Sequence, residues 1–131
     1  MTVLKQGFPT ASLGNIMSWI EKVSKQLDLT PVLIDWGICN ANPLRLEEFI
    51  AFCMQHSPNE SMEYEELADL VLESAAKSIE DGTFTMERKK LVVDFIREKS
   101  DLFPIQLNYW LTFESKEICP ILPVVKEAAD A

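Results

Sequence analysis

Cys53 and His56 come nearest to catalytic chemistry in this sequence, because an imidazole three residues from a thiol on one helix can reach it. A working nucleophile also needs a group that orients the imidazole and donors for an oxyanion, and the sequence supplies neither. Cys53 belongs to the apolar face of its predicted helix, and His56 suits the C-terminal end, where the helix dipole favours a cation. His56 is the only histidine, which excludes sites that need two imidazoles. We predict that the chain is not an enzyme, and an unrecognised active site remains an alternative.

Acidic side chains are the second group that could do chemistry, since carboxylates bind divalent cations. Glu66, Asp69 and Glu73 share one face of one predicted helix, and carboxylates that point the same way cannot surround a metal. The stretch EDGTFTMER resembles the middle of a calcium loop, but Lys77 and Ile79 stand where acidic ligands are required. We therefore predict no metal site and no cofactor.

Length and composition describe an ordinary globular chain with an unusual charge. The 131 residues suit a single domain, residues 1–131, and 47% of them are hydrophobic. We expect a cytoplasmic location, because no export signal or membrane-spanning run is apparent. Three cysteines, Cys39, Cys53 and Cys119, fit neither a disulfide framework nor a zinc site and are expected to be reduced thiols.

The elements that position these residues are all predicted to be helical. Capping residues, prolines and helical spacing of apolar residues predict helices from Ser12 to about Asp28, from Thr30 to Trp36 with Gly37 as its end, from Asn42-Pro43 to the Ser57-Pro58-Asn59 break, from Ser61 to Gly82, from Thr85 to Ser100 and from Ile105 to Phe113. Strand is a less favoured alternative for the last of these. Pro120 and Pro123 bracket ILPVV, which is predicted to be an extended lead-in to a terminal helix. The fold class is therefore all-α, a compact bundle of five to seven helices.

The helix from Ser61 to Gly82 is amphipathic and strongly acidic. A helical wheel gathers Glu63, Glu66, Asp69, Glu73 and Glu80 on one side, with Leu70 at its margin. Together these six residues are the candidate partner-binding surface, in which Leu70 is an apolar anchor among charges. Two alternatives remain open: a plain solvated face, and a Leu70 covered by neighbouring helices.

The negative charge is concentrated along the chain. Residues 44–81 hold ten acidic residues and two basic ones out of totals of 21 and 12. Arg88, Lys89 and Lys90 open the next helix, but they are too few to neutralise this field. An exposed acidic field repels nucleic acid and attracts a basic surface on another protein.

The segment QLNYWLTF is rich in aromatic residues. Tyr109 and Trp110 could form a ligand slot, although core packing is the stronger interpretation because tryptophans are usually mostly buried.

From Asn42 to Leu122 the chain resembles, in character and layout, the immunity proteins of bacterial toxin and immunity pairs. The acidic YEELADLVLESAAKSIEDG helix, the following TMERKKLVVDFI helix and the NYW segment carry this resemblance. It implies stoichiometric binding and neutralisation of a cognate toxin, often a nuclease, whose basic cleft would accept the acidic helix in place of phosphates. The expected state is a monomer or weak dimer that binds neither nucleic acid nor membrane. An adaptor or regulatory module that binds a basic protein without inhibiting it is the alternative.

Overall fold

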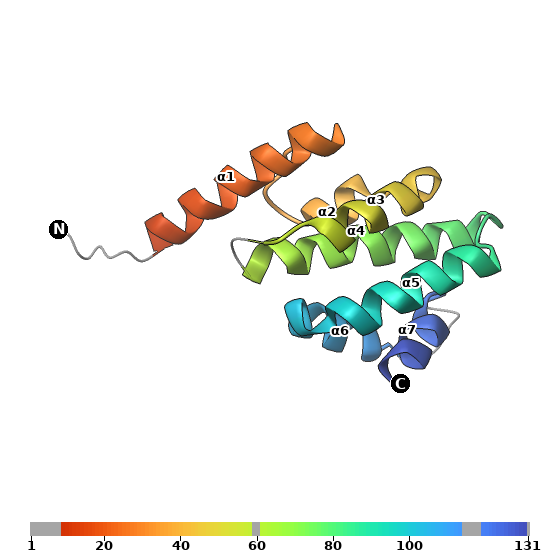
Figure 1. Ribbon diagram of the computed structural model, residues 1–131. Helices are drawn as coiled ribbons and strands as arrows, with labels where there is room; N and C mark the ends of the chain where they lie inside the picture. The colour runs from red at the N-terminus through yellow and green to blue at the C-terminus, as the bar shows by residue number, and fades with distance from the viewer. Residues whose placement is uncertain (1–8, 59–60, 114–118, 131) are drawn as a thin grey trace.

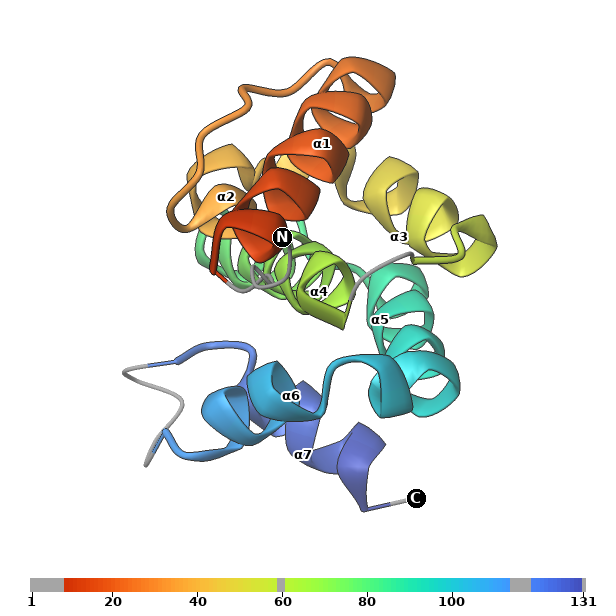
Figure 2. The same ribbon diagram turned by 90° about the vertical axis from the view of Figure 1, so that its left-hand side faces the viewer.

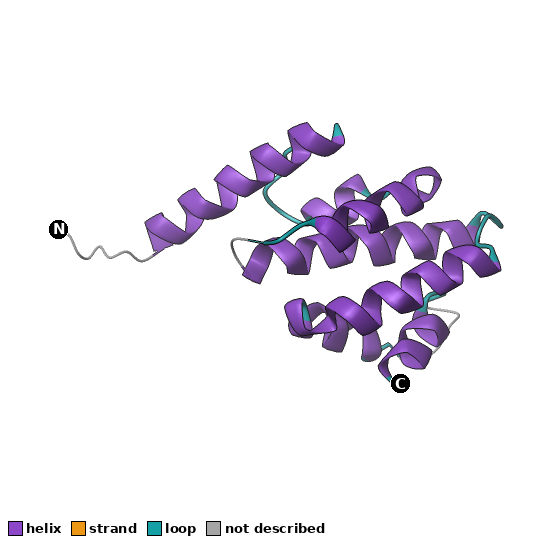
Figure 3. Cartoon of the chain, viewed as in Figure 1, coloured by secondary structure: helices purple, strands orange, loops and turns teal. Residues whose placement is uncertain are grey.

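The computed structural model describes residues 9–58, 61–113 and 119–130, and these ranges contain helices and loops but no strand (Figure 3). The elements in chain order are α1 (Pro9–Leu27), α2 (Trp36–Asn40), the 3-10 turn η2 (Pro43–Arg45), α3 (Leu46–Gln55), α4 (Ser61–Glu80), α5 (Met86–Lys99), the 3-10 turn η3 (Ser100–Leu102), α6 (Pro104–Leu111) and α7 (Leu122–Ala129). The prediction of an all-α bundle is confirmed.

Helix α4 is the centre of the bundle (Figure 1). In the view of Figure 2 it is seen nearly end-on, with α1, α2 and α3 on one side and α6 and α7 on the other. Helix α5 runs alongside, in contact with both α3 and α7. A helix surrounded in this way has little surface left for solvent, so several of its acidic side chains are buried.

Two groups of aromatic residues anchor the core. Tyr64 of α4, Phe95 of α5 and Phe103 stack with nearly parallel rings, and the Tyr64 hydroxyl donates to the Cys53 carbonyl of α3 at 2.7 Å. Trp36 of α2 packs edge-on against Trp19 of α1, and its indole N–H donates to the Ser24 hydroxyl at 2.8 Å. These contacts fix α1, α2, α3 and α5 around α4.

Several helix ends lie where the capping signals predict them. The side chains of Asn42 and Thr85 accept from the Leu44 and Arg88 amides at 3.0 and 3.1 Å, as N-cap residues do. Gly82 follows α4 with a φ of 80°, a left-handed conformation that glycine adopts without strain. Pro104 begins α6, which is helical rather than extended. Asn59 of the predicted break lies outside the described residues.

The prediction of a helix from Thr30 to Trp36 is wrong. Residues 29–35 form a loop, and α2 begins at Trp36, after Asp35 adopts a left-handed φ of 55°. Asn40 holds this loop by bonding both the amide and the carbonyl of Thr30 at 2.9 Å. Gly37 therefore lies inside a helix instead of ending one.

The need for glycine at position 37 comes from packing. A Cβ there would lie 2.3 Å from the Glu66 carbonyl oxygen and 2.7 Å from the Leu70 amide nitrogen, both in the backbone of α4. Helix α2 therefore lies directly on the α4 backbone, on the side that the sequence analysis assigned to solvent.

The ILPVV segment also differs from its prediction. Leu122, Val124 and Val125 are helical residues of α7, with Pro123 in its first turn. Proline at this position lacks an N–H that would have no partner in the helix, so it begins α7 without interrupting it.

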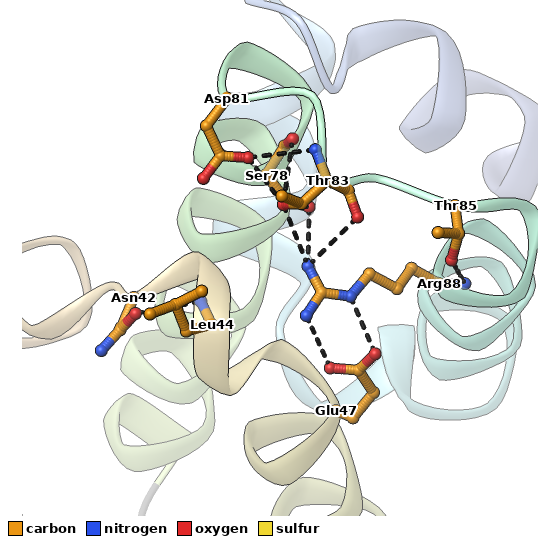
Figure 4. Close-up of polar contacts among 8 residues, drawn as sticks. All are labelled: Asn42, Leu44, Glu47, Ser78, Asp81, Thr83, Thr85 and Arg88. Carbon is orange, nitrogen blue, oxygen red and sulfur yellow. Dashed lines mark hydrogen bonds and ion pairs between the residues drawn. The ribbon is translucent and has the colours of Figure 1, made fainter.

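Arg88 ties the start of α5 to two other elements (Figure 4). Its guanidinium forms a fork with the Glu47 carboxylate of α3 at 2.8 and 2.9 Å, and it donates to the Ser78 hydroxyl of α4 at 2.8 Å. In the adjoining turn, the Asp81 carboxylate accepts from the amide and hydroxyl of Thr83. The EDGTFTMER stretch is therefore a turn closed by its own side chains, as the interpretation of a helix end followed by a new cap predicts.

Candidate functional site

The structure buries three of the six residues of the candidate partner-binding surface. Leu70 has no exposed area, and Glu63 and Asp69 are 1% and 5% exposed. The prediction that Glu63 and Asp69 belong to an exposed binding surface is therefore wrong, because α4 is enclosed by its neighbours. Of the two alternatives for Leu70, the structure shows the one in which neighbouring helices cover it. Glu66 and Glu73 are partly buried, and Glu80 is exposed.

Glu63 contacts the imidazole Nε2 of His56. His56 is the C-cap of α3, in agreement with its predicted place at a helix end, and its ring stacks on Phe52 with centroids 4.8 Å apart. Cys53 is fully buried, and burial raises the pKa of its thiol, which disfavours the thiolate. The His56 imidazole thus faces the Glu63 carboxylate.

Glu65 and Asp69 hold α6 against α4. The Glu65 carboxylate accepts from the backbone amides of Ile105 and Gln106 at 3.3 and 2.8 Å, in the first turn of α6. Asp69 accepts from the Gln106 side chain at 2.7 Å and from the Trp110 indole N–H at 3.0 Å. Both carboxylates are buried. The first turn of a helix has free N–H groups and a positive dipole end, so Glu65 serves as a cap supplied by another helix.

Glu66 does the same for α2. One of its carboxylate oxygens accepts from the Gly37 amide at 3.0 Å, again in a first helical turn. Burial raises the pKa of Glu66, and the nearby negative charges of Asp69 and Asp35 raise it further, against the opposing effect of the Gly37 bond. The carboxylates of Glu65, Glu66 and Asp69 therefore fasten α2 and α6 to α4.

Sequence reasoning missed Glu65 and Gly37. Glu65 lies away from the acidic side of the wheel, and Gly37 was interpreted as a helix stop. Gly37, directly after Trp36, is the one sequence signal for a close helix contact here, because glycine allows another backbone to approach. Nothing in the sequence indicates which helix approaches it.

A cleft remains on the surface where α2, α4 and α6 meet, and we call it the α2–α6 cleft. It has a volume of about 140 Å³, and its lining includes Ile38, Glu73, Glu80, Tyr109, Trp110 and Phe113. Two residues of the predicted partner-binding set, Glu73 and Glu80, thus lie in one cleft. Trp110 packs in the core as predicted, whereas Tyr109 is 47% exposed, so the aromatic segment contributes to both the core and the cleft.

The aromatic side of the cleft is a packed cluster. The Tyr109 ring meets those of Trp110 and Phe113 nearly at right angles, with centroids 5.9 and 5.3 Å apart. The Trp110 indole is fixed by the hydrogen bond that its N–H donates to Asp69. The buried carboxylates of α4 therefore set the position of the aromatic residues that border the cleft.

Among the described residues, Lys77 is the basic side chain that pairs with the acidic side of the cleft. Burial raises the pKa of Glu73, and the charges of Glu80 and Asp69 raise it further, whereas Lys77 lowers it from a distance of 4.0 Å. The basic residues that open α5 do not reach the cleft: Arg88 pairs with Glu47, Lys89 with Glu127 and Lys90 with Asp94.

Apolar side chains are exposed on both elements that border the cleft. Leu33 and Ile34 precede α2 and are 50% and 79% exposed, and Ile38 lies on α2 itself. Ile105 and Tyr109 are exposed one helical turn apart on α6. A negative cleft with apolar borders is an arrangement suited to a protein partner of opposite charge.

No group of three or more His, Cys, Asp or Glu side chains in the described ranges could hold a metal, and none of the helices described there is long and apolar enough to cross a membrane. Comparison with protein-family models, with curated proteins and with solved structures gives no match to this chain.

Proposed function

We propose that this protein is a non-catalytic binding module that neutralises a bacterial toxin by holding a basic surface of that toxin at the α2–α6 cleft. The observation that carries the proposal is the cleft itself, in which Glu73 and Glu80 lie beside the aromatic cluster of α6. This differs from the surface predicted by the helical wheel, since Glu63, Asp69 and Leu70 are inside the bundle.

Charge supports a basic partner. The chain has a net charge of −9, and the basic side chains at the start of α5 are engaged by carboxylates outside the cleft. A cleft of one sign raises the local concentration of an oppositely charged partner and speeds its encounter.

The buried polar groups support binding without catalysis. The thiols of Cys53 and Cys119 both have a pKa raised by burial, and the His56 imidazole contacts Glu63. Neither arrangement activates a nucleophile.

The test is a titration against a toxin domain, sought in the reading frames that neighbour the gene of this chain. Activity of the toxin should fall to zero at a ratio of about one to one, since a binding inhibitor acts without turnover. Full inhibition at ratios far below one would contradict the proposal and indicate an enzymatic antidote. A stable complex that leaves the toxin active would indicate an adaptor.

A further inference from the structure

We propose that the α2–α6 cleft binds the guanidinium group of an arginine side chain that a protein partner inserts between α2 and α6. This inference rests on the proposed function and names the chemical group that the cleft recognises. It depends on two properties of the cleft: the carboxylates of Glu73 and Glu80, which accept no hydrogen bond from the residues that the structure describes, and the aromatic surface of Tyr109.

The acceptors are Glu73 and Glu80. Among the residues that the structure describes, the only polar contact of the Glu73 carboxylate is Lys77 at 4.0 Å, and the Glu80 carboxylate has none. Glu73 is only 26% exposed, so water reaches it from one side. By contrast, Glu65, Glu66 and Asp69 on the same helix all accept hydrogen bonds from neighbouring helices. Within the described ranges, Glu73 and Glu80 are thus the carboxylates of this cleft that accept no hydrogen bond, and Lys77 is the ion-pair partner of Glu73.

The aromatic surface comes from Tyr109, which is half exposed and held edge-to-face between Trp110 and Phe113. A cation over an aromatic ring is attracted by its quadrupole, and this attraction grows where water is partly excluded. Ile38, on the opposite border, offers apolar contact to the methylene stem of a long side chain.

A guanidinium group can use both kinds of surface at once. It stacks flat on an aromatic ring while its fork of N–H donors bonds a carboxylate at two points. A quaternary ammonium has no donors and would form no hydrogen bond with either carboxylate. Glu73 and Glu80 are seven residues apart, which places them about 10 Å apart along the helix axis, so one planar group reaches the first while the second attracts the approaching charge.

The experiment is an NMR titration of the full chain with N-acetyl-arginine methylamide. Its matched probes are the citrulline derivative, which is a neutral isostere, and tetramethylammonium chloride. We expect saturable shifts of the Trp110 indole N–H and the Tyr109 ring with the arginine probe at concentrations up to about 50 mM, the range for one isolated side chain. Citrulline should give no saturable shift.

Two variants complete the test. Glu73→Gln with Glu80→Gln keeps the size of both side chains and should weaken arginine binding by about tenfold or more. The exposed Glu98→Gln, which lies on α5 outside the cleft lining, should leave it unchanged. Dispersed amide spectra establish that each variant is folded.

Contrary outcomes are distinct. Equal shifts with citrulline, an absence of saturation, tighter binding of tetramethylammonium, or insensitivity to the double variant would each overturn the arginine site. If the toxin is neutralised equally by the double variant, the proposed function survives without the arginine site. If arginine binds but no toxin is neutralised, the site survives without the proposed function.

Discussion

Leu70 shows how a helical wheel fails at the scale of one residue. The wheel placed it among charged residues, yet it is fully buried because α2 packs on that side of α4. Truncating a buried leucine removes its packing and leaves a cavity, so we expect Leu70→Ala to lower the free energy of unfolding by about 2 to 5 kcal/mol.

Chemical denaturation of the free protein measures this cost. Met62, at the other margin of the acidic side, is 50% exposed, so Met62→Ala is the matched control and should change stability little. A Leu70→Ala protein as stable as the original would mean that α2 does not cover α4 in solution.

At position 37 the protein should be destabilised by a larger side chain, whereas at position 70 it should be destabilised by a smaller one. Replacing glycine by alanine inside a helix normally stabilises it by about 1 kcal/mol. Here the added Cβ would clash with two backbone atoms of α4, so we expect Gly37→Ala to destabilise the protein by about 1 to 3 kcal/mol.

Gly82→Ala separates the two reasons for which this chain needs glycine. No atom lies within 4 Å of a Cβ at position 82, but the φ of 80° is strained for alanine, and we expect a cost of about 1 to 2 kcal/mol. In Gly37→Ala, α2 should lose its contact with α4, and its amides should exchange faster. In Gly82→Ala the α2 amides should exchange as in the original protein.

Asp69 makes stability depend on pH. Burial raises the pKa of its carboxyl group, and the charges of Glu65 and Asp35 raise it further, against its hydrogen bonds to Gln106 and Trp110. A raised pKa means that the folded state binds the proton more tightly than the unfolded chain does. The stabilisation from protonation is therefore complete below the ordinary aspartate pKa and is lost as the pH rises through the raised value.

We accordingly expect the contribution of Asp69 to the melting temperature to grow as the pH falls from neutral toward the ordinary carboxyl pKa. Glu66 and Glu73 have raised pKa values for the same main reason and contribute with the same sign. Asp69→Asn should flatten this dependence, whereas Asp101→Asn, at an exposed position, should preserve it. Parallel melting curves for the original protein and Asp69→Asn would contradict this account.

At the scale of elements, α6 depends on a cap from outside its own sequence. Its N-cap residue, Phe103, has no side-chain acceptor, and Glu65 of α4 bonds the Ile105 and Gln106 amides instead. Glu65→Gln keeps one acceptor but removes the charge that faces the helix dipole, so we expect a loss of about 1 kcal/mol.

Hydrogen exchange locates this loss, since the Ile105 and Gln106 amides should exchange faster in Glu65→Gln than in the original protein. Glu87→Gln is the matched control, because Glu87 is an exposed carboxylate in the first turn of α5. It should leave the exchange of the Ile105 and Gln106 amides unchanged. Exchange that accelerates equally throughout the bundle would indicate a general loss of stability instead of a lost cap.

Local signals predicted the helices well where a residue close to the helix end fixes that end. Asn42, Thr85 and Gly82 act within a few residues of their position, so the sequence nearby contains the whole cause. The failures involve distant partners. Residues 30–35 follow a helix-capping signal but form a loop that Asn40 holds, and the carboxylates of α4 bond helices 29 to 41 residues away in the chain.

The same limit applies to the candidate site. Glu73 and Glu80 were predicted as binding residues and do line a cleft, but Glu63, Asp69 and Leu70 share their face of the wheel and are buried. Periodicity identifies which residues share a face. It does not show which part of a long helix its neighbours cover, because that depends on where α2 and α6 end.

At the scale of the whole molecule, negative charge exceeds positive charge by nine, and the described ion pairs use the basic side chains at the start of α5 away from the cleft. Among the described residues, the field at the cleft therefore depends chiefly on Glu73 and Glu80, with Lys77 paired to Glu73 at 4.0 Å. Such a field acts on an approaching partner at distances up to about 10 Å at moderate salt.

Charge reversal tests this field in the complex with the toxin. Glu73→Lys combined with Glu80→Lys should slow association by about tenfold or more at low salt and remove most of its salt dependence, because steering requires complementary charge. Glu21→Lys combined with Glu98→Lys changes the net charge equally at exposed positions outside the cleft lining and should alter association much less. Stopped-flow rates at two salt concentrations distinguish the pairs. If both pairs slow association equally, the partner responds to total charge and not to the cleft.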